Sequence, residues 1–416
     1  MVTLKANPFL SPIFVFLSQQ EIEKFDSKFL NSIPPDSSTG YILECDLSYP
    51  AELHDLHGDY PLAPEHIEIT EDMLSPYAKS LIDPLHPWQP SKKLVPNVMS
   101  KSKYVCHYRN LQFYLNHGLK LEKIHRIMSF TQSPWLKPWV DLCTEQRKTA
   151  RSDFESDLAK LQVNSTFGKT MENVRNRVNL RLIADPNKFL KATGKVSFRY
   201  CQIVNDNLVL VRTARQKVTL NKPISIGFTI LELSKLLMFS FFYDHLKVKY
   251  GNRCTLLFTD TDSLCCHIQT ENLYEDMGMD LVEYDTSNFE KEHNLFSMTN
   301  HRVLGKFKSE TGSIAPREFV GLRSKMYSLD CGEKSQKKVK GVKKHYVKKN
   351  VVHKDFLAVL KKQKISTMAH FNTFKSTNHV LNTVNMSKLC LNAFDDKRFI
   401  LPDGINTLPY GHKDIG

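Results

Sequence analysis

Two aspartates with one residue between them, in the segment LLFTDTDSL, are the residues best suited to chemistry. Asp260 and Asp262 stand between apolar runs, so the sequence predicts a hairpin over 255–268 with both carboxylates at its turn. Adjacent carboxylates repel each other and lose hydration unless a cation lies between them. Their oxygen ligands suit Mg²⁺ better than zinc. An ordinary Asp-rich turn explains the pattern equally well.

A second pair of acids lies in the segment YILECDLSYP. Glu44 and Asp46 are two residues apart on a predicted strand and therefore share one face of it. A carboxylate from this face could complete a metal site begun by the hairpin. The alternative is an edge strand with a polar face.

A third group of candidates lies in the segment KLQVNSTFGK. Lys160, Asn164 and Phe167 recur at helical spacing and share one face of a predicted helix. A lysine, an amide and an aromatic ring could hold a triphosphate, a sugar edge and a base plane. Such a stripe is more often a solvated helix face. The indication of a catalytic site therefore comes from the hairpin acids, the strand acids and this helix face taken together.

The elements that must position these residues are mixed in type. Apolar periodicity predicts helices over 111–121, 154–163 and 223–250, and strands at 41–43 and in the hairpin. Strands and helices without βαβ alternation indicate an α+β fold with an antiparallel sheet. The apolar segment Pro8–Leu17 is expected to be buried rather than to be a signal peptide.

Positive charge is concentrated near the C-terminus. The 416 residues carry 57 Lys and Arg against 44 Asp and Glu, a net charge of +13. Twelve lysines and one acid, Asp355, lie between Lys334 and Lys364, so this lysine stretch holds a net +11 and accounts for nearly the whole excess. Apolar residues interleave with the lysines, so we expect the stretch to fold and to bind a polyanion, most simply nucleic acid.

Length, apolar runs and cysteines exclude several classes of protein. The chain is long enough for two or three domains, and its apolar runs are far shorter than the ~20 residues that span a bilayer, so we predict no membrane partner. Nine cysteines without a Cys-x-x-Cys motif argue for reduced thiols and against a disulfide framework or zinc site.

The motifs, in this order, resemble those of family B DNA polymerases from about residue 40 to residue 350. The hairpin FTDTDS is similar to the family's Tyr-x-Asp-Thr-Asp-Ser, and KLQVNSTFG to its Lys-x-x-x-Asn-Ser-x-Tyr-Gly. ECDLSYP resembles Asp-x-x-Ser-Leu-Tyr-Pro, and LRSKMY resembles the Lys-x-Tyr region. Segments 53–65 and 104–139 look like those of protein-primed members from transposons and linear plasmids.

The sequence departs from the family pattern at three points. Phe258 and Phe167 replace tyrosines, which removes hydroxyl groups but keeps the ring faces. Thr259 stands where glycine is common. In the first motif, alignment on Tyr49-Pro50 puts Glu44 at the metal aspartate, and Asp46 follows two residues later. Either acid can reach a metal, and we favour Asp46 because aspartate is the family's residue type.

The resemblance implies a right-hand polymerase fold with an antiparallel palm sheet, helical fingers and a basic thumb. It divides the chain into an N-terminal segment with the first palm strand (1–60), a palm insertion (61–140), fingers helices (141–180), palm (181–332) and a thumb that is short (333–416). Only about 40 residues precede the first motif, too few for the exonuclease domain usual in the family.

The resemblance also implies roles for individual residues. The metal ligands would be Asp46 or Glu44 together with Asp260 and Asp262. The nucleotide would be contacted by Tyr49, Arg147, Lys148, Lys160, Asn164 and Phe167. The DNA would be gripped by Lys325 and Tyr327 and tracked by lysines of the stretch, Lys338, Lys340, Lys343 and Lys344.

The implied function is DNA-directed DNA polymerase, with two Mg²⁺ ions, deoxynucleoside triphosphates, primer-template DNA and, in the protein-primed mode, a terminal-protein primer as partners. One alternative is a decayed mobile-element remnant that only binds nucleic acid. Another is a nuclease or other two-metal phosphotransferase, which leaves the face of Lys160, Asn164 and Phe167 unexplained. The sequence indicates an intracellular protein and does not separate nucleus from cytoplasm.

Overall fold

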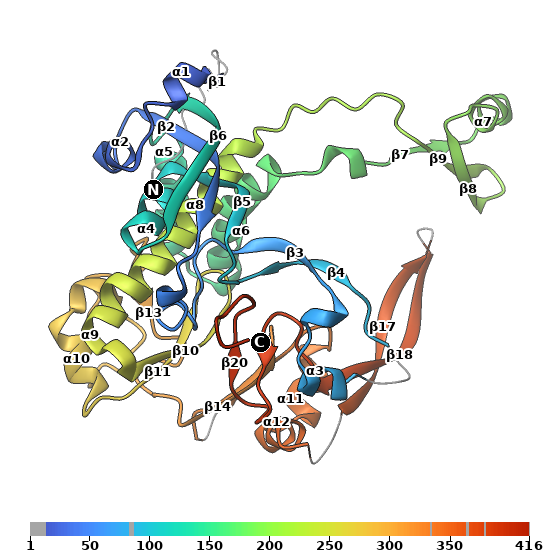
Figure 1. The fold of residues 1–416 in the computed structure, drawn as a ribbon. Coiled ribbons are helices and arrows are strands. Elements are labelled where there is room, and N and C mark those ends of the chain that lie inside the picture. Colours follow the sequence, from blue (N-terminus) through green and yellow to red (C-terminus); the bar gives the residue numbers. More distant parts are fainter. Residues whose placement is uncertain (1–13, 83–86, 333–334, 363–365, 378–379, 416) are drawn as a thin grey trace. The chain divides into compact units, whose positions relative to one another are not determined.

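The computed structural model describes residues 14–82, 87–332, 335–362, 366–377 and 380–415, and it mixes helices and strands in similar amounts (Figure 1). The longer strand pairs are antiparallel. The two-residue pair of β12 with β13 is parallel. This mixture agrees with the α+β prediction.

The helices and strands have the following bounds. The helices are α1 (Gln19–Ile22), α2 (Ser27–Ser32), α3 (Pro76–Ser80), α4 (Tyr108–Asn116), α5 (Lys137–Lys148), α6 (Asp153–Thr170), α7 (Pro186–Thr193), α8 (Ile224–Ser240), α9 (Val248–Tyr250), α10 (Leu273–Met279), α11 (Lys344–Asn350) and α12 (His353–Leu360). The strands are β1 (Val15–Phe16), β2 (Thr39–Ser48), β3 (Glu65–Ile69), β4 (Ser91–Val95), β5 (Lys101–His107), β6 (Lys120–Thr131), β7 (Asn179–Ile183), β8 (Phe198–Asn205), β9 (Leu208–Thr213), β10 (Cys254–Thr259), β11 (Leu264–Ile268), β12 (Tyr284–Asp285), β13 (Phe307–Lys308), β14 (Glu318–Arg323), β15 (Met326–Asp330), β16 (Ser335–Val339), β17 (Ser366–Thr377), β18 (Val380–Asn392), β19 (Phe399–Ile400) and β20 (Thr407–Leu408).

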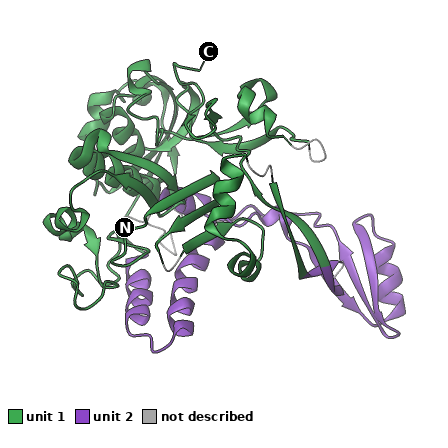
Figure 2. Ribbon diagram, turned by 90° about the horizontal axis from the view of Figure 1, so that it is seen from below, with its two compact units in different colours: residues 1–135, 231–372, 385–416 green, residues 136–230, 373–384 purple. Residues whose placement is uncertain are grey.

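The chain forms two compact units (Figure 2). Unit 1 comprises residues 1–135, 231–372 and 385–416, and unit 2 comprises residues 136–230 and 373–384. The predicted fingers segment 141–180 lies in unit 2, together with residues 181–230 that we assigned to the palm. The division into palm, fingers and thumb stays a prediction.

Unit 1 is built around a four-stranded sheet in the order β1-β6-β2-β5. Strand β2 alternates as its sequence predicts, with Leu43, Cys45 and Leu47 buried and the residues between them partly exposed. Helix α4 follows β5 and packs Leu111 and Tyr114 into the same core. The helix predicted over 111–121 ends at Asn116, because Gly118 turns the chain in a left-handed conformation at φ 93°.

A long apolar helical segment covers this core. It runs from α8 through a π-helical stretch, Phe241–Lys247, into α9, as predicted over 223–250. By length and composition Ile224–Arg253 could cross a membrane, which our search for uninterrupted apolar runs missed. Its Glu232 is buried, accepts from the His107 backbone N–H and pairs with Lys235, the contacts of a core helix.

The lysine stretch folds in unit 1, as its interleaved apolar residues predict. It forms β16, α11 and α12, and β16 extends the sheet of β14 and β15. Val339, Val347 and Phe356 are buried in a second hydrophobic cluster, while most of the described lysines are exposed. Lys334 and Lys364, which bound the stretch, lie outside the described residues.

Unit 2 contains a helical pair and a small sheet. Helix α6 begins at an N-cap, Ser152, whose hydroxyl accepts from the Glu155 N–H, and it packs against α5. The strands that follow pair in the order β7-β9-β8, with α7 between β7 and β8 in the chain. Asp185 caps α7, and Pro186 occupies its first turn.

One prediction of burial is wrong, and one predicted helix carries its apolar residues on an exposed face. The segment Pro8–Leu17 was expected to be buried, but Val15 and Phe16 are 46% and 66% exposed, and residues 8–13 lie outside the described chain. The strand β1 that they form lies at the edge of the four-stranded sheet, where no other described strand pairs with its outer side. Phe154, Leu158 and Leu161 do lie on the predicted helix α6, but all three are exposed.

Candidate active site

Glu44 and Asp46 lie on the partly exposed face of β2, as predicted. The guanidinium of Arg126 on β6 donates to both oxygens of Glu44, at 2.6 and 3.1 Å, and this lowers the pKa of Glu44. Asp46 accepts from the Lys103 backbone N–H at 2.7 Å and lies 2.8 Å from His125 Nε2, and both contacts lower the pKa of Asp46. Each acid is therefore paired within its own sheet.

Irregular strand pairing brings these partners to the acids. The register of β2 with β6 shifts between Glu44 and Cys45 and again between Asp46 and Leu47. The first shift leaves His125 as the extra residue, which lets its ring reach Asp46. On the other side Lys103 adopts a left-handed conformation, φ 50°, and points its N–H at Asp46.

The predicted hairpin is present as β10 and β11, with Asp260 and Asp262 at its turn. The Asp260 N–H donates to the Ser263 carbonyl at 3.1 Å, and the Asp262 N–H donates to the Asp260 carbonyl at 2.7 Å. Thr261 between them has φ 64°, an unusual conformation for a β-branched residue. Such backbone strain is found at functional sites more often than elsewhere.

Asp260 is held by two lysines from the following sheet. Lys325 Nζ lies 3.1 Å from Oδ1 and Lys338 Nζ lies 3.2 Å from Oδ2. Partial burial alone would raise the pKa of Asp260, but the two ammonium groups outweigh it and lower the pKa. Asp262 is exposed at the other end of the turn.

The hairpin and β2 pack on one hydrophobic core. Leu256 and Cys254 of β10 belong to the same buried cluster as Leu43 and Leu47 of β2. The segment that follows β2 also contacts the hairpin directly, because Asp59 Oδ2 accepts from the Leu256 N–H at 3.2 Å. The two acid-bearing elements are thus parts of one packed body.

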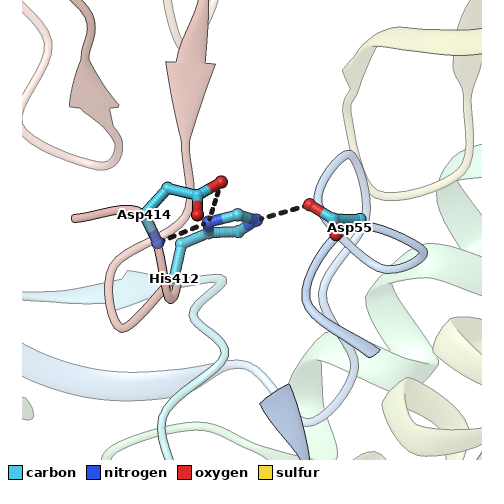
Figure 3. Close-up of side chains that lie close together, drawn as sticks. All are labelled: Asp55, His412 and Asp414. Carbon is cyan, nitrogen blue, oxygen red and sulfur yellow. Dashed lines mark hydrogen bonds and ion pairs between the residues drawn. The ribbon is translucent and has the colours of Figure 1, made fainter. Parts of the chain in front are cut away.

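These acids do not form a compact ligand group as they stand. Within the described ranges, a group of three or more Asp, Glu, His or Cys ligand atoms all within 4.8 Å of one another occurs only at Asp55, His412 and Asp414 (Figure 3). The donor chemistry of Asp46, Asp260 and Asp262 suits a hard cation. His125 and the Lys103 backbone N–H hold Asp46, and the ammonium groups of Lys325 and Lys338 hold Asp260, so a metal at Asp260 would have to replace the two lysines.

The group in Figure 3 links two distant parts of the chain through ion pairs. Asp55 lies 3.4 Å from Nε2 of His412, whereas Asp414 lies 3.6 Å from Nδ1, on the other side of the ring. The two acids therefore have their shortest contacts with different nitrogens of the ring. The ammonium of Lys413 also pairs with Asp55. These contacts join the chain's last described residues to the loop after β2.

Tyr49 is buried, with 6% of its surface exposed. Its hydroxyl lies 2.8 Å from Nδ1 of His57 and accepts from the Leu62 N–H at 3.2 Å. Burial raises the pKa of Tyr49 and lowers the pKa of His57 to about 4, so His57 is neutral at pH 7. The predicted contact of Tyr49 with a deoxyribose would need this ring to become more exposed.

The predicted nucleotide-binding face lies in unit 2. On α6, Lys160 and Asn164 are exposed and Phe167 is partly exposed, one face of the helix as their spacing predicts. Arg147 and Lys148 end the neighbouring helix α5. The Nε of Arg147 is buried without a hydrogen-bond partner in the described part of the chain, and Lys148 pairs with Glu145 at 3.0 Å.

The predicted DNA-binding residues lie in unit 1. Lys325 occupies the turn between β14 and β15 at φ 60°, and Tyr327 follows on β15. The Tyr327 ring stacks on Phe258 of the hairpin with centroids 4.2 Å apart. Lys340, Lys343 and Lys344 are exposed. Lys325 is directed toward Asp260 and stands in the turn, before the strand that carries Tyr327.

The structure adds residues that sequence reasoning missed. His125, Lys103 and Asp59 contact the acids or their hairpin, but no spacing in the sequence marks them. His125 and Lys103 depend on a strand bulge and on a left-handed residue, and neither feature has a signature here such as glycine. The two pairs of acids, by contrast, are marked by their spacing in the sequence.

Comparisons with known proteins give one structural match and no sequence match. No family model and no curated protein matches the sequence. Among solved structures, Phi29 DNA polymerase complexed with primer-template DNA, in a post-translocation binary complex, is similar to 92% of this chain, with 13% sequence identity and a TM-score of 0.47. The chain spans about half, 54%, of that protein.

Proposed function

We propose that this chain is a DNA-directed DNA polymerase of the family B type and that it resembles the protein-primed members. The observation that carries the proposal is the strained turn with Asp260 and Asp262, packed on the same core as the strand with Glu44 and Asp46. Carboxylates on two elements that pack on one core are the starting point that a two-metal phosphotransferase requires.

The reaction is an in-line phosphoryl transfer. The primer 3′-hydroxyl attacks the α-phosphorus of a deoxynucleoside triphosphate, its proton leaves, and pyrophosphate departs. Two Mg²⁺ ions, when bound, would make the hydroxyl more acidic and neutralise the departing charge. Asp46 or Glu44, with Asp260 and Asp262, would hold them.

The nucleotide would be held by the exposed face of α6. Lys160 places an ammonium group where charge rises on the triphosphate, so its loss should slow the reaction as well as weaken binding. Asn164 and Phe167 would face the new base pair, and Arg147 and Lys148 would add phosphate contacts. Tyr49 would restrict the 2′ position of the sugar.

The DNA would be held by the sheet that follows the hairpin. Lys325 and Tyr327 would grip the primer strand, and Lys338, Lys340, Lys343 and Lys344 would follow the duplex phosphates without reading sequence. In this arrangement Lys325 and Lys338 would pair with DNA phosphates instead of Asp260, which would leave the Asp260 carboxylate able to hold a metal. A terminal protein, as a separate chain, would supply the primer hydroxyl in the protein-primed mode.

Primer extension tests the proposal. Wild type with Mg²⁺ should extend a short primed DNA template, and Asp262→Asn should lower the rate about a thousand-fold, since a missing metal ligand removes several kcal/mol of transition-state stabilisation. Asp72→Asn, which changes an exposed acid of unit 1, is the matched control and should extend normally. Extension that is equal in Asp262→Asn and wild type would contradict the assignment.

A non-catalytic nucleic-acid-binding protein is the second candidate. The observation that favours it is the pairing of Asp260 with Lys325 and Lys338, which leaves that acid neutralised without a metal. DNA binding by the unmutated chain, without extension on DNA or RNA templates in Mg²⁺ or Mn²⁺, would support this candidate over the polymerase.

A further inference from the structure

Unit 2 contains a second concentration of positive charge. Residues 173–222 carry eleven lysines and arginines and two acids, Asp185 and Asp206, a net charge of +9. The total is +13 and the lysine stretch holds +11, so the residues outside both basic regions carry −7. The conclusion that one stretch accounts for nearly the whole excess was therefore wrong, because an acidic remainder hid a second basic region. We call residues 173–222 the basic module.

The basic module is folded, and its charges are on its surface. It contains the sheet β7-β9-β8 with α7 (Figure 2, within the purple unit). Eight of its cations are exposed and make no ion pair with a described residue: Arg175, Arg181, Lys188, Lys191, Lys195, Arg199, Arg215 and Lys217. The other three are Arg177 and Lys222, which pair with Glu172, and Arg212, which lies over the Tyr200 ring at 5.7 Å.

A folded surface of one sign repels itself and attracts a polyanion. The basic module differs from the lysine stretch in composition, since six of its eleven cations are arginines, whereas the stretch has none. Arginine presents a planar set of donors that matches a phosphate group in two-pronged hydrogen bonds. The cations are distributed over strands, helix and loops, which suits a long ligand better than a small one.

We propose that the basic module binds the phosphate backbone of nucleic acid, as a surface additional to the lysine stretch and without reading sequence. The choice of nucleic acid as the polyanion rests on the proposed function, but the binding itself requires no catalysis. Interactions of this kind add affinity that decreases steeply with salt, because each neutralised phosphate releases counterions.

The test removes three neighbouring charges from the full-length chain. Lys188, Lys191 and Lys195 lie on α7 or just after it and are changed together to glutamine. Anisotropy of a labelled primer-template, measured in EDTA at several salt concentrations, gives the affinity and its salt slope. We expect the slope to become shallower by about 0.9 for each phosphate that the variant no longer neutralises, and the affinity at low salt to fall about ten-fold.

Two control variants match the charge and the fold. Lys24, Lys28 and Lys79 are exposed lysines outside both basic regions, and their change to glutamine should leave the slope as in wild type. Changing Lys188, Lys191 and Lys195 to arginine keeps the charge and should keep the binding. If the glutamine variant does not fold, a second variant with Arg175, Arg181 and Arg199 changed to glutamine removes three charges from the same module. Its comparison with the arginine variant, which keeps all charges, then gives the same test.

The outcomes separate this inference from the proposed function. An unchanged affinity and slope in the folded glutamine variant would overturn the inference. Loss of binding to vesicles of phosphatidylcholine and phosphatidylserine, with DNA binding unchanged, would overturn it in favour of a membrane surface. A shallower slope in a chain that extends no primer would support the inference while the polymerase proposal fails, and Asp262→Asn should show the same slope as wild type.

Discussion

The two acid-bearing elements of unit 1 are held in different ways. On β2, Glu44 and Asp46 are paired by groups of adjacent strands, Arg126, His125 and the Lys103 N–H. At the hairpin, Asp260 is paired by lysines that lie more than 60 residues later in the chain. The β2 acids are therefore fixed by their own sheet, whereas the position of Asp260 depends on the basic segment that would also meet DNA. This difference suggests that the hairpin is the adjustable half of the site.

Replacement of the two β2 acids gives the largest expected effect. If Asp46 is the first metal ligand, Asp46→Asn should lower the primer-extension rate about a thousand-fold, because the loss of a metal ligand removes several kcal/mol from transition-state stabilisation. Glu44→Gln should then lower the primer-extension rate about ten-fold or less, because in the wild-type chain Glu44 pairs with Arg126 and would not bind the metal. The measurement is single-turnover extension with saturating Mg²⁺.

The same pair of variants can reverse the assignment. A larger loss in Glu44→Gln than in Asp46→Asn would place the metal on the acid that aligns with Tyr49-Pro50. Equal extension by both variants and wild type would remove β2 from the site. DNA affinity in EDTA is the control for folding.

The β2 side also depends on a buried neutral imidazole. The pKa of His57 in the folded chain is lowered by burial to about 4, against 6.5 for the free side chain. Between these pH values the unfolded chain binds a proton that the folded chain does not, so the free energy of unfolding should decrease as pH falls from 6.5 to 4. The contribution of His57 to this loss is about 3 kcal/mol.

His57→Gln removes the titration and keeps a polar group for the Tyr49 hydroxyl. Its free energy of unfolding, measured by urea titration from pH 8 to pH 4, should fall less steeply with acid than that of wild type. His66→Gln changes an exposed histidine and should follow the wild-type curve. Parallel curves for His57→Gln and wild type would show that His57 is not held neutral.

Much of the fold was predictable because local periodicity determines it. The alternation in β2, the hairpin around Asp260 and Asp262 and the helix 223–250 each follow from residues a few positions apart. The shared face of Lys160, Asn164 and Phe167 follows from the same rule. The roles of these residues in nucleotide binding stay predictions.

The rest was not predictable because it depends on contacts between distant residues. His125 reaches Asp46 through a strand bulge, and Lys338 reaches Asp260 across 78 positions of sequence, so neither pair has a local signal. The apolar Phe16 was expected in the core, but it lies on an edge strand. The basic module is hidden in the net charge because that sum also includes acidic segments elsewhere in the sequence.

The hairpin side can be tested by removing the lysines from Asp260. Lys325→Gln with Lys338→Gln should raise the affinity of the DNA-free chain for Mn²⁺ about ten-fold, because two partly exposed ion pairs together are worth about 1.4 kcal/mol and compete with the metal. Calorimetric titration of Mn²⁺ measures this. Lys340→Gln with Lys343→Gln is the matched control. An unchanged affinity would show that the lysines do not compete with a cation at Asp260.

The smallest effect concerns the backbone beside each acid. Thr261 after Asp260 and Lys103 beside Asp46 both have positive φ, 64° and 50°. Thr261 is more strained than Lys103 at positive φ, because its side chain is β-branched. Glycine relieves the strain but makes the unfolded chain more flexible, so Thr261→Gly should stabilise the fold by about 0.5 kcal/mol and Lys103→Gly should be near neutral.

The measurement is the shift in urea midpoint for Thr261→Gly and Lys103→Gly, with Thr261→Ala as a control that lacks the branch but keeps a Cβ. Thr261→Ala should lie between wild type and Thr261→Gly. If Thr261→Gly is instead destabilising while Lys103→Gly is neutral, the threonine is holding the hairpin turn in place. The hairpin would then be as rigid as β2, and the difference between the two halves of the site would lie in their ion pairs alone.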